Sequence, residues 1–268
     1  MFTIITKLHN SIFSYNAIKA LGISSYASYL LQFALNISKI ARFGNLSPLD
    51  RAMGFVTKDF QYRGSSFVFD CGFCDKNLDE DSYGFGIARE IYIRDCYFKH
   101  QPEWVYRSAK TVVDLGGNRG AFSSLMTTTA ERIVIVECCE QYEKIIENNF
   151  IKNKFSKYYL EKSFIGEGGM TMSDSNVISM VELFDRYELE TIDFMKMDIE
   201  GSEFSLFQRS DWLEKVKSIS MEVHGDFGSP SEIIEILRSK GFSLRVADEN
   251  LTEIHDTINA CFIYAWRE

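Results

Sequence analysis

The chain has 268 residues, 46% hydrophobic and 25% charged, the proportions of a globular protein with room for one sizeable domain and an appendage. Its net charge of −9 argues against nucleic acid as the main partner, because binding to phosphates requires a basic surface. Six cysteines without a secretory pattern favour reduced thiols and a cytoplasmic location, with a membrane-peripheral location as the alternative.

The first 49 residues are basic and contain no acidic residue, whereas the rest of the chain is acidic. The basic residues are Lys7, Lys19, Lys39 and Arg42. Such a segment predicts peripheral contact of residues 1–49 with an anionic membrane surface, or contact with a partner. Residues 20–38 are uncharged, but they are too polar to predict a span of the membrane.

Apolar residues of this segment recur at spacings of three and four and predict one helical face. They are Tyr26, Leu30, Phe33, Ile37 and Ile40. This face can pack on the main domain or on a second subunit of a homo-oligomer, or it can lie in a membrane interface. A targeting presequence is a further alternative, because the segment lacks acidic residues and is rich in serine.

From residue 60 onward the pattern predicts a hairpin and then alternating strands and helices. The hairpin is expected at 60–70 and a first helix near 86–99. The expected strands are 111–116, 132–137, 157–166, 193–200, 218–225, 242–248 and 260–268. The further helices are expected to begin at about 120, to cover 140–155, to follow the strand at 193–200 as far as about 215, and to cover 231–241. Ser229, Pro230 and Glu232 are typical of an N-cap with a capping box, and Gly241 is placed to end that helix. The alternation predicts an α/β fold, doubly wound around a mostly parallel sheet, with an antiparallel strand at one edge.

The loop after the strand at 111–116 is the first candidate binding site, because ligands of open α/β sheets bind at the carboxyl ends of the strands. The spacing of Asp114, Gly116 and Gly120 differs from the dinucleotide pattern G-x-G-x-x-G, and a carboxylate would repel a diphosphate. Asp114 instead suits the cationic amino group and sulfonium of S-adenosylmethionine. A nicotinamide cofactor and a turn without a ligand remain alternatives.

Glu137 ends the next strand and can accept hydrogen bonds from two ribose hydroxyls. Every nucleoside cofactor offers these hydroxyls, so Glu137 supports a nucleoside site without choosing between cofactors.

Four segments together resemble the FkbM-type methyltransferases, a family of class I S-adenosylmethionine-dependent methyltransferases. They read VVDLGGNRGAFS, IVIVE, DFMKMDIEGSEFSLF and ISMEVHG, and the resemblance covers about residues 85–268. It implies a Rossmann-like methyltransferase domain with a seven-stranded sheet over 85–268, preceded by an extension of helices and a hairpin over 1–84. It also implies O-methylation of a saccharide, glycolipid or secondary metabolite. A nicotinamide-dependent oxidoreductase and an inactive methyltransferase-fold binding module are the alternative functions.

The resemblance and the strand ends together define the expected cofactor site. The residues are Asp114, Gly116, Gly117, Asn118, Gly120, Glu137, Cys138, Ser163, Phe164 and Asp198. Ser163 and Phe164 are expected to border the adenine, although Phe164 suits the core equally well. The sequence departs from the family at two of these positions: Gly117 replaces a common Ala, which we expect to be harmless, and Cys138 replaces a Pro.

Methyl transfer to a hydroxyl requires alignment of donor and acceptor and removal of a proton. Asp198, Glu200, Glu222 and His224 are the expected catalytic residues, because they follow two neighbouring strands. His224 is the preferred base because its unperturbed pKa lies near neutrality. Glu222 can orient the imidazole or hold the acceptor hydroxyl. Glu203 belongs either to this site or to the first turn of a helix, where acidic residues are common.

No metal is predicted, although two groups of potential ligands exist. Cys71, Cys74, Cys96 and His100 could bind zinc, but their loose spacing favours cysteines that pack in the core. The carboxylates expected at the catalytic site could in principle hold a divalent cation.

Overall fold

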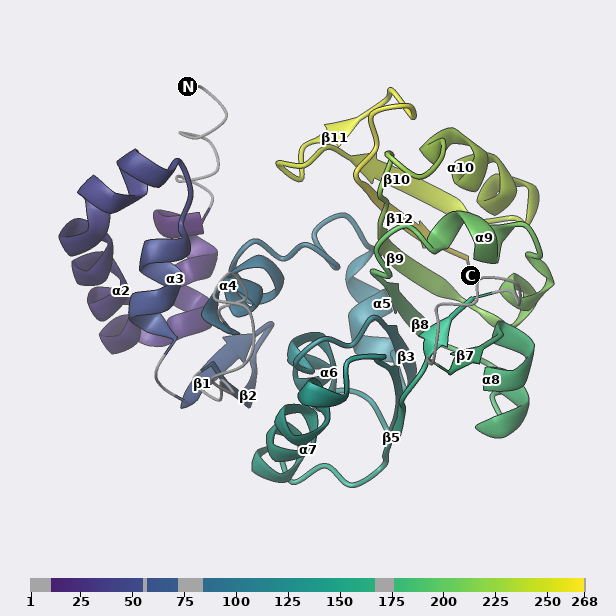
Figure 1. The fold of residues 1–268 in the computed structure, drawn as a ribbon, viewed down its shortest axis with the longest axis horizontal. Coiled ribbons are helices and arrows are strands. Elements are labelled where there is room, and N and C mark those ends of the chain that lie inside the picture. The colour runs from purple at the N-terminus through teal and green to yellow at the C-terminus, as the bar shows by residue number, and fades with distance from the viewer. Residues whose placement is uncertain (1–10, 55–56, 72–83, 167–175, 268) are drawn as a thin grey trace. The chain divides into compact units, whose positions relative to one another are not determined.

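The computed structural model describes residues 11–54, 57–71, 84–166 and 176–267, and the chain folds into two compact units (Figure 1). The first unit comprises residues 1–96, 119–128 and 141–156, and the second comprises residues 97–118, 129–140 and 157–268. This grouping is discontinuous in sequence and differs from the expected division at residue 84, because two helices of the alternating region group with the N-terminal segment. Cys74, one of the four potential zinc ligands that the sequence analysis considered and did not favour, lies outside the described residues.

The first unit is helical with one hairpin. Its elements are α2 (Tyr15–Phe43), α3 (Ser47–Met53), β1 (Thr57–Tyr62), β2 (Ser65–Asp70), α4 (Gly84–Ala88), the π-helix η1 (Arg89–Ile93), α6 (Ala121–Met126) and α7 (Glu143–Lys152). Strands β1 and β2 pair in antiparallel register, which confirms the hairpin predicted at 60–70. The single helix expected near 86–99 is wrong, because the helical backbone ends at Ile93.

The buried side of α2 differs in part from the predicted face. Ile40 is buried as expected, but Ile37 is 54% exposed. The buried stripe passes through Tyr29, whose hydroxyl donates to the carbonyl of Ser11 and whose ring packs on Phe85. No described helix is both long and apolar enough to cross a membrane. The expected membrane contact of residues 1–49 and a homo-oligomer both remain predictions.

The second unit is built on one eight-stranded sheet of order β11-β10-β12-β9-β8-β3-β4-β5. The strands are β3 (Thr111–Leu115), β4 (Arg132–Val136), β5 (Tyr158–Glu161), β8 (Phe194–Met197), β9 (Ser218–Glu222), β10 (Ser243–Ala247), β11 (Glu253–Ile254) and β12 (Phe262–Trp266). The five strands from β9 to β5 are parallel, which confirms the mostly parallel α/β sheet. The antiparallel strand β12 lies between β9 and β10, however, and not at the edge as expected.

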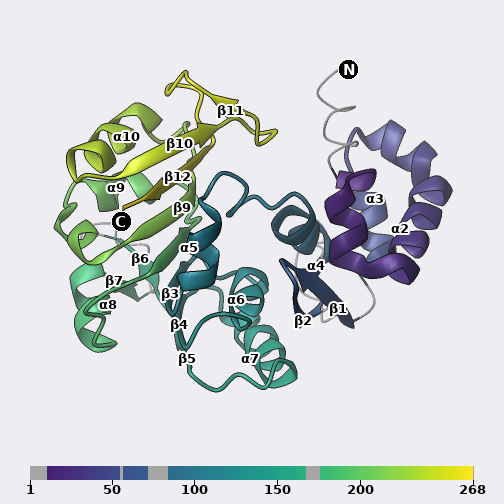
Figure 2. The same cartoon turned by 180° about the vertical axis from the view of Figure 1, so that it is seen from behind.

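Helices of the second unit cover one face of this sheet with an apolar core (Figures 1 and 2). They are α8 (Met180–Arg186), α9 (Glu203–Phe207), the 3-10 helix η3 (Asp211–Lys215) and α10 (Pro230–Ser239). The capping box expected at Ser229 is wrong, since its side chain makes no capping hydrogen bond. Ser179 and Glu182 form a capping box at the start of α8, a helix that the sequence analysis missed.

The opposite face of the sheet carries polar side chains in its centre. Asp114, Lys196 and Ser220 are all buried there. The segment that leads into α5 (Glu103–Ser108) covers them: the amide of Gln101 donates to the Ser220 hydroxyl at 2.9 Å, and that hydroxyl donates to the carbonyl of Tyr97. A polar layer inside the fold therefore leads to the carboxyl ends of β3, β8 and β9.

A buried ion pair holds the first unit together and gives a test of its packing. The Arg89 guanidinium donates to both oxygens of Asp50, at 3.0 and 2.8 Å, and both residues are buried. Asp50→Asn removes the buried partner of this cation and leaves it with the less buried Glu90, so we expect the free energy of unfolding to fall by up to about 3–5 kcal/mol. Urea denaturation measures this difference. The exposed Asp59→Asn should change stability by less than about 0.5 kcal/mol, and equal effects of the two variants would contradict the packing described.

Candidate functional site

Two glycines shape the loop that follows β3. The amides of Gly116 and Gly117 both donate to the carbonyl of Val136, at 3.0 and 3.1 Å. Gly116 has a φ of +77°, and a Cβ there would lie 1.7 Å from the backbone oxygen of Asp198. A Cβ on Gly117 would lie 2.3 Å from Cγ2 of Ile135, so an alanine would require that side chain to move. The glycine that this chain carries in place of the common Ala therefore suits its packing, and the expectation that this departure is harmless stays a prediction.

Glu137 ties the glycine loop to the end of β4. Its two carboxylate oxygens accept the amides of Asn118 and Cys139 at 2.6 and 2.7 Å. Burial raises the pKa of Glu137, and these hydrogen bonds oppose the shift. Each oxygen retains a further lone pair, so the carboxylate can also accept from a ribose hydroxyl. The neighbouring Cys138 is exposed.

Three other expected cofactor residues have structural partners. Gly120 belongs to the first unit, where a Cβ would lie 3.2 Å from Cγ1 of Ile146, so it permits close helix packing. Ser163 is buried and its hydroxyl donates to Glu161 at 3.1 Å. Phe164 is half-buried in the short strand β6 (Phe164–Ile165), which pairs with β7 (Val177–Ile178). These contacts give each residue a structural role, and their expected contact with the cofactor stays a prediction.

Asp114 pairs with Lys196, a residue that the sequence analysis missed. The two residues lie opposite each other in the register of β3 and β8, and Nζ of Lys196 is 3.3 Å from Oδ1 of Asp114. The same ammonium donates to the carbonyl of Gly116. Burial lowers the pKa of Lys196, but Asp114 and Asp198 outweigh burial and raise it. Asp114 has no exposed surface, so it supports the glycine loop through Lys196 and does not face the cofactor directly as expected.

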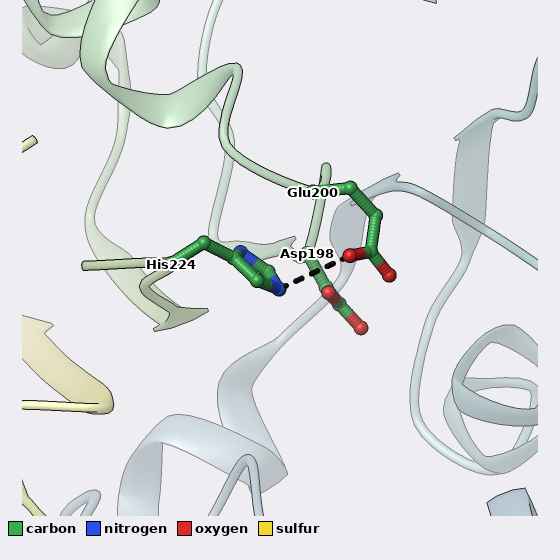
Figure 3. A group of neighbouring side chains, drawn as sticks. All are labelled: Asp198, Glu200 and His224. Carbon is green, nitrogen blue, oxygen red and sulfur yellow. Dashed lines mark ion pairs between the residues drawn. The ribbon is translucent and has the colours of Figure 1, made fainter. Parts of the chain in front are cut away.

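Three expected catalytic residues come together beyond β8 and β9. Ligand atoms of Asp198, Glu200 and His224 all lie within 4.8 Å of one another (Figure 3). Nε2 of His224 is 3.3 Å from Oε2 of Glu200, whose side chain is 86% exposed. Oδ2 of Asp198 accepts the hydroxyl of Tyr97 at 3.1 Å. We call Asp198, Glu200 and His224 the acidic–histidine cluster.

A wholly buried carboxylate orients the imidazole of this cluster. Oε1 of Glu203 lies 2.9 Å from Nδ1 of His224, and Glu203 has no exposed surface. This hydrogen bond raises the pKa of His224 to about 9, against a smaller lowering by burial. The imidazole is therefore protonated at neutral pH, and the expectation of a near-neutral base is wrong. Glu203, and not Glu222, orients His224.

Glu222 lies apart from the cluster. It is the last residue of β9 and pairs with Phe262 of β12. Its charge helps to raise the pKa of Cys261, after the larger effects of burial and Glu249, so its carboxylate lies near that thiol. The alternation that grouped Glu222 with His224 was extended too far, because the strand ends at Glu222.

The missed residues carried weak signals in the sequence. Lys196 interrupts the apolar run of β8, and such a lysine needs a buried anion nearby. Tyr97 follows the helix η1, and no sequence pattern distinguishes it from other tyrosines. Glu203 lies in the segment that resembles the family, but its burial depends on contact with His224, 21 residues further along the chain.

The comparisons with known proteins support a methyltransferase. Residues 141–244 match the family model described as the Methyltransferase FkbM domain, which confirms the resemblance over that part of the chain. The matched range contains the acidic–histidine cluster and Glu203 and begins after the glycine loop. No curated protein is significantly similar to the chain in sequence.

Several solved methyltransferases are similar in fold. FkbM methyltransferase from Methylobacillus flagellatus KT is 15% identical, with 67% of this chain and 53% of that chain covered and a TM-score of 0.43. A methyltransferase from Agrobacterium tumefaciens is 12% identical, with coverages of 79% and 70% and a TM-score of 0.46. A putative methyltransferase from Streptococcus mutans, in complex with SAH, is 8% identical, with coverages of 61% and 92% and a TM-score of 0.42.

A substitution in the glycine loop tests its role in cofactor binding. Gly116→Ala places a methyl group against the Asp198 carbonyl and strains a positive φ, so the loop must move. We expect the affinity for S-adenosylhomocysteine, measured by calorimetry, to fall at least about tenfold. Gly166→Ala is the control, because a Cβ there meets Val177 at an ordinary 3.6 Å. Similar affinities of the two variants would exclude the loop from the cofactor site.

Proposed function

We propose that this chain, which carries an FkbM methyltransferase domain over residues 141–244, is an O-methyltransferase for a hydroxyl of a saccharide, glycolipid or secondary metabolite. The observation that carries the proposal is the position of the acidic–histidine cluster. The backbone oxygen of Asp198 fills the space beside Gly116, while its side chain belongs to the cluster. A cofactor on the glycine loop and an acceptor at the cluster would therefore be neighbours.

The residues around the loop fit S-adenosylmethionine. Glu137 offers acceptor capacity for ribose. Gly116 and Gly117 let the loop pack closely against Asp198 and Ile135, which holds the loop beside Glu137. When bound, the cofactor supplies an electrophilic methyl group on a sulfonium. The carboxylates of Asp198 and Glu200 provide negative charge at the adjoining strand ends, where it stabilises a cation.

The cluster also supports handling of a hydroxyl group. An acceptor oxygen between Nε2 of His224 and the carboxylate of Glu200 can receive a hydrogen bond from the imidazolium and donate its own proton to the carboxylate. Glu203 keeps the imidazole in one orientation during this exchange. The net charge of −9 favours such a small acceptor over nucleic acid.

Binding measurements test the cofactor site first. Calorimetry should show that the protein binds S-adenosylhomocysteine and does not bind NADH. Glu137→Ala removes an ionised hydrogen-bond acceptor, and each such bond contributes about 1.5–3 kcal/mol, so the affinity should fall at least about tenfold. The exposed Glu140→Ala is the matched control. Absence of binding in folded protein would favour the inactive binding module.

Kinetics test the cluster once a screen of hydroxylated saccharides and lipids has identified an acceptor. Glu200→Gln and His224→Gln should each lower kcat by about 100-fold or more, because proton transfer at the acceptor oxygen is impaired. Their affinity for S-adenosylhomocysteine should change by less than about threefold. Glu235→Gln, on the exposed side of α10, is the control. Full turnover in both cluster variants would contradict the assigned site, and transfer to amines but not hydroxyls would contradict the O-methyltransferase.

A further inference from the structure

We propose that the acidic–histidine cluster binds a divalent first-row transition-metal cation such as Mn²⁺. The cation would occupy the space between Nε2 of His224 and the carboxylates of Asp198 and Glu200 (Figure 3). Its use in catalysis, as a ligand for the acceptor oxygen, rests on the proposed function. The cation site itself rests on the geometry of the cluster.

The spacing of the donor atoms suits a shared cation. Nε2 of His224 and Oε2 of Glu200 are 3.3 Å apart. Two ligands that are each about 2.1 Å from a cation, at a right angle, lie about 3 Å apart. The ligand atoms of all three residues lie within 4.8 Å of one another, so small side-chain movements bring Asp198 into the same shell.

Glu203 supplies a second, independent observation. Its carboxylate is wholly buried, and Oε2 has no hydrogen-bond partner among the described residues. Oε1 binds Nδ1 of His224, so Nε2 faces the cluster. A cation bound there would displace the Nε2 proton and take its lone pair, in place of the imidazolium present without a cation. A carboxylate in this position orients histidine ligands and increases their basicity in metal sites. A buried carboxylate with one unpaired oxygen also requires positive charge nearby.

The side chains around the cluster carry more negative than positive charge, which suits a divalent cation. In the described part of the chain, Asp198 forms an ion pair with Lys196, while Glu200 and Glu203 both pair with His224. Lys196 is turned toward Asp114 and the carbonyl of Gly116, where it lies 3.9 Å from Asp198. A divalent cation at the cluster would balance the remaining negative charge.

The donor set indicates the class of metal. Two carboxylates suit hard cations, whereas one imidazole favours first-row transition metals over Mg²⁺ and Ca²⁺. Three protein ligands leave positions for water and for an acceptor oxygen. A hydroxyl bound there would lose its proton more readily, because the cation acts as a Lewis acid.

Titration of the cofactor-free, chelator-treated protein with MnCl₂ tests the site, with free Mn²⁺ followed by its EPR signal. We expect one site whose dissociation constant rises at least about tenfold in Glu200→Gln and in His224→Gln. Glu203→Gln should weaken binding by about 10–100-fold, although it is not a ligand. Glu235→Gln should bind as the wild type does. Circular dichroism establishes that each variant is folded, and the exposed Glu200 provides a test if a buried variant is not.

Two results would overturn the proposal: no saturable binding of Mn²⁺ in folded wild-type protein, or equal binding by the wild type and the Glu200 variant. S-adenosylhomocysteine titration in parallel separates the two hypotheses. Cofactor binding without Mn²⁺ binding leaves the methyltransferase intact and removes the cation site. Mn²⁺ binding that depends on the cluster, without cofactor binding, leaves the cation site intact and removes the proposed function.

Discussion

The buried ion pair between Asp114 and Lys196 is the interaction on which the geometry of the site depends. Burial of two charges is costly, and it is tolerated only where additional hydrogen bonds complete the coordination of both groups. Here Nζ of Lys196 also donates to the carbonyl of Gly116. The buried ion pair therefore fixes the position of the glycine loop. The pair also joins β3 to β8, which makes the two loops beyond these strands parts of one rigid edge.

From this pair the constraints extend in two directions. Toward β4, Glu137 binds the amides of Asn118 and Cys139 and thereby fixes the side of the glycine loop that suits a ribose. Toward β9, Tyr97 holds Asp198 and Glu203 holds His224. Each functional group thus has a buried or half-buried partner that limits its movement. Such prior ordering lowers the entropy that a bound ligand would otherwise have to remove.

The sequence predicted the parts of the site that depend on local pattern. The parallel strands, the glycine loop and Glu137 follow from alternation and from turns, and these require only short stretches of chain. Glu203 and Tyr97 could not be assigned in this way, because their partners are 21 and 101 residues away. Lys196 was visible as a lysine in an apolar strand, but its pairing depends on the register of β3 with β8. Glu222 shows the converse error, since strand alternation was extended past the residue at which β9 ends.

Asp198 contacts both parts of the site, the glycine loop through its backbone and the acidic–histidine cluster through its side chain. Its backbone oxygen occupies the space that a side chain at Gly116 would fill, and its carboxylate lies with Glu200 and His224. A movement of this residue therefore changes the glycine loop and the acidic–histidine cluster together. Because Tyr97 and Lys196 both face the carboxylate of Asp198, the buried polar layer of the sheet sets the position of that carboxylate. The polar residues beneath the sheet edge consequently determine the distance between the glycine loop and the acidic–histidine cluster, the two places proposed for the methyl donor and its acceptor.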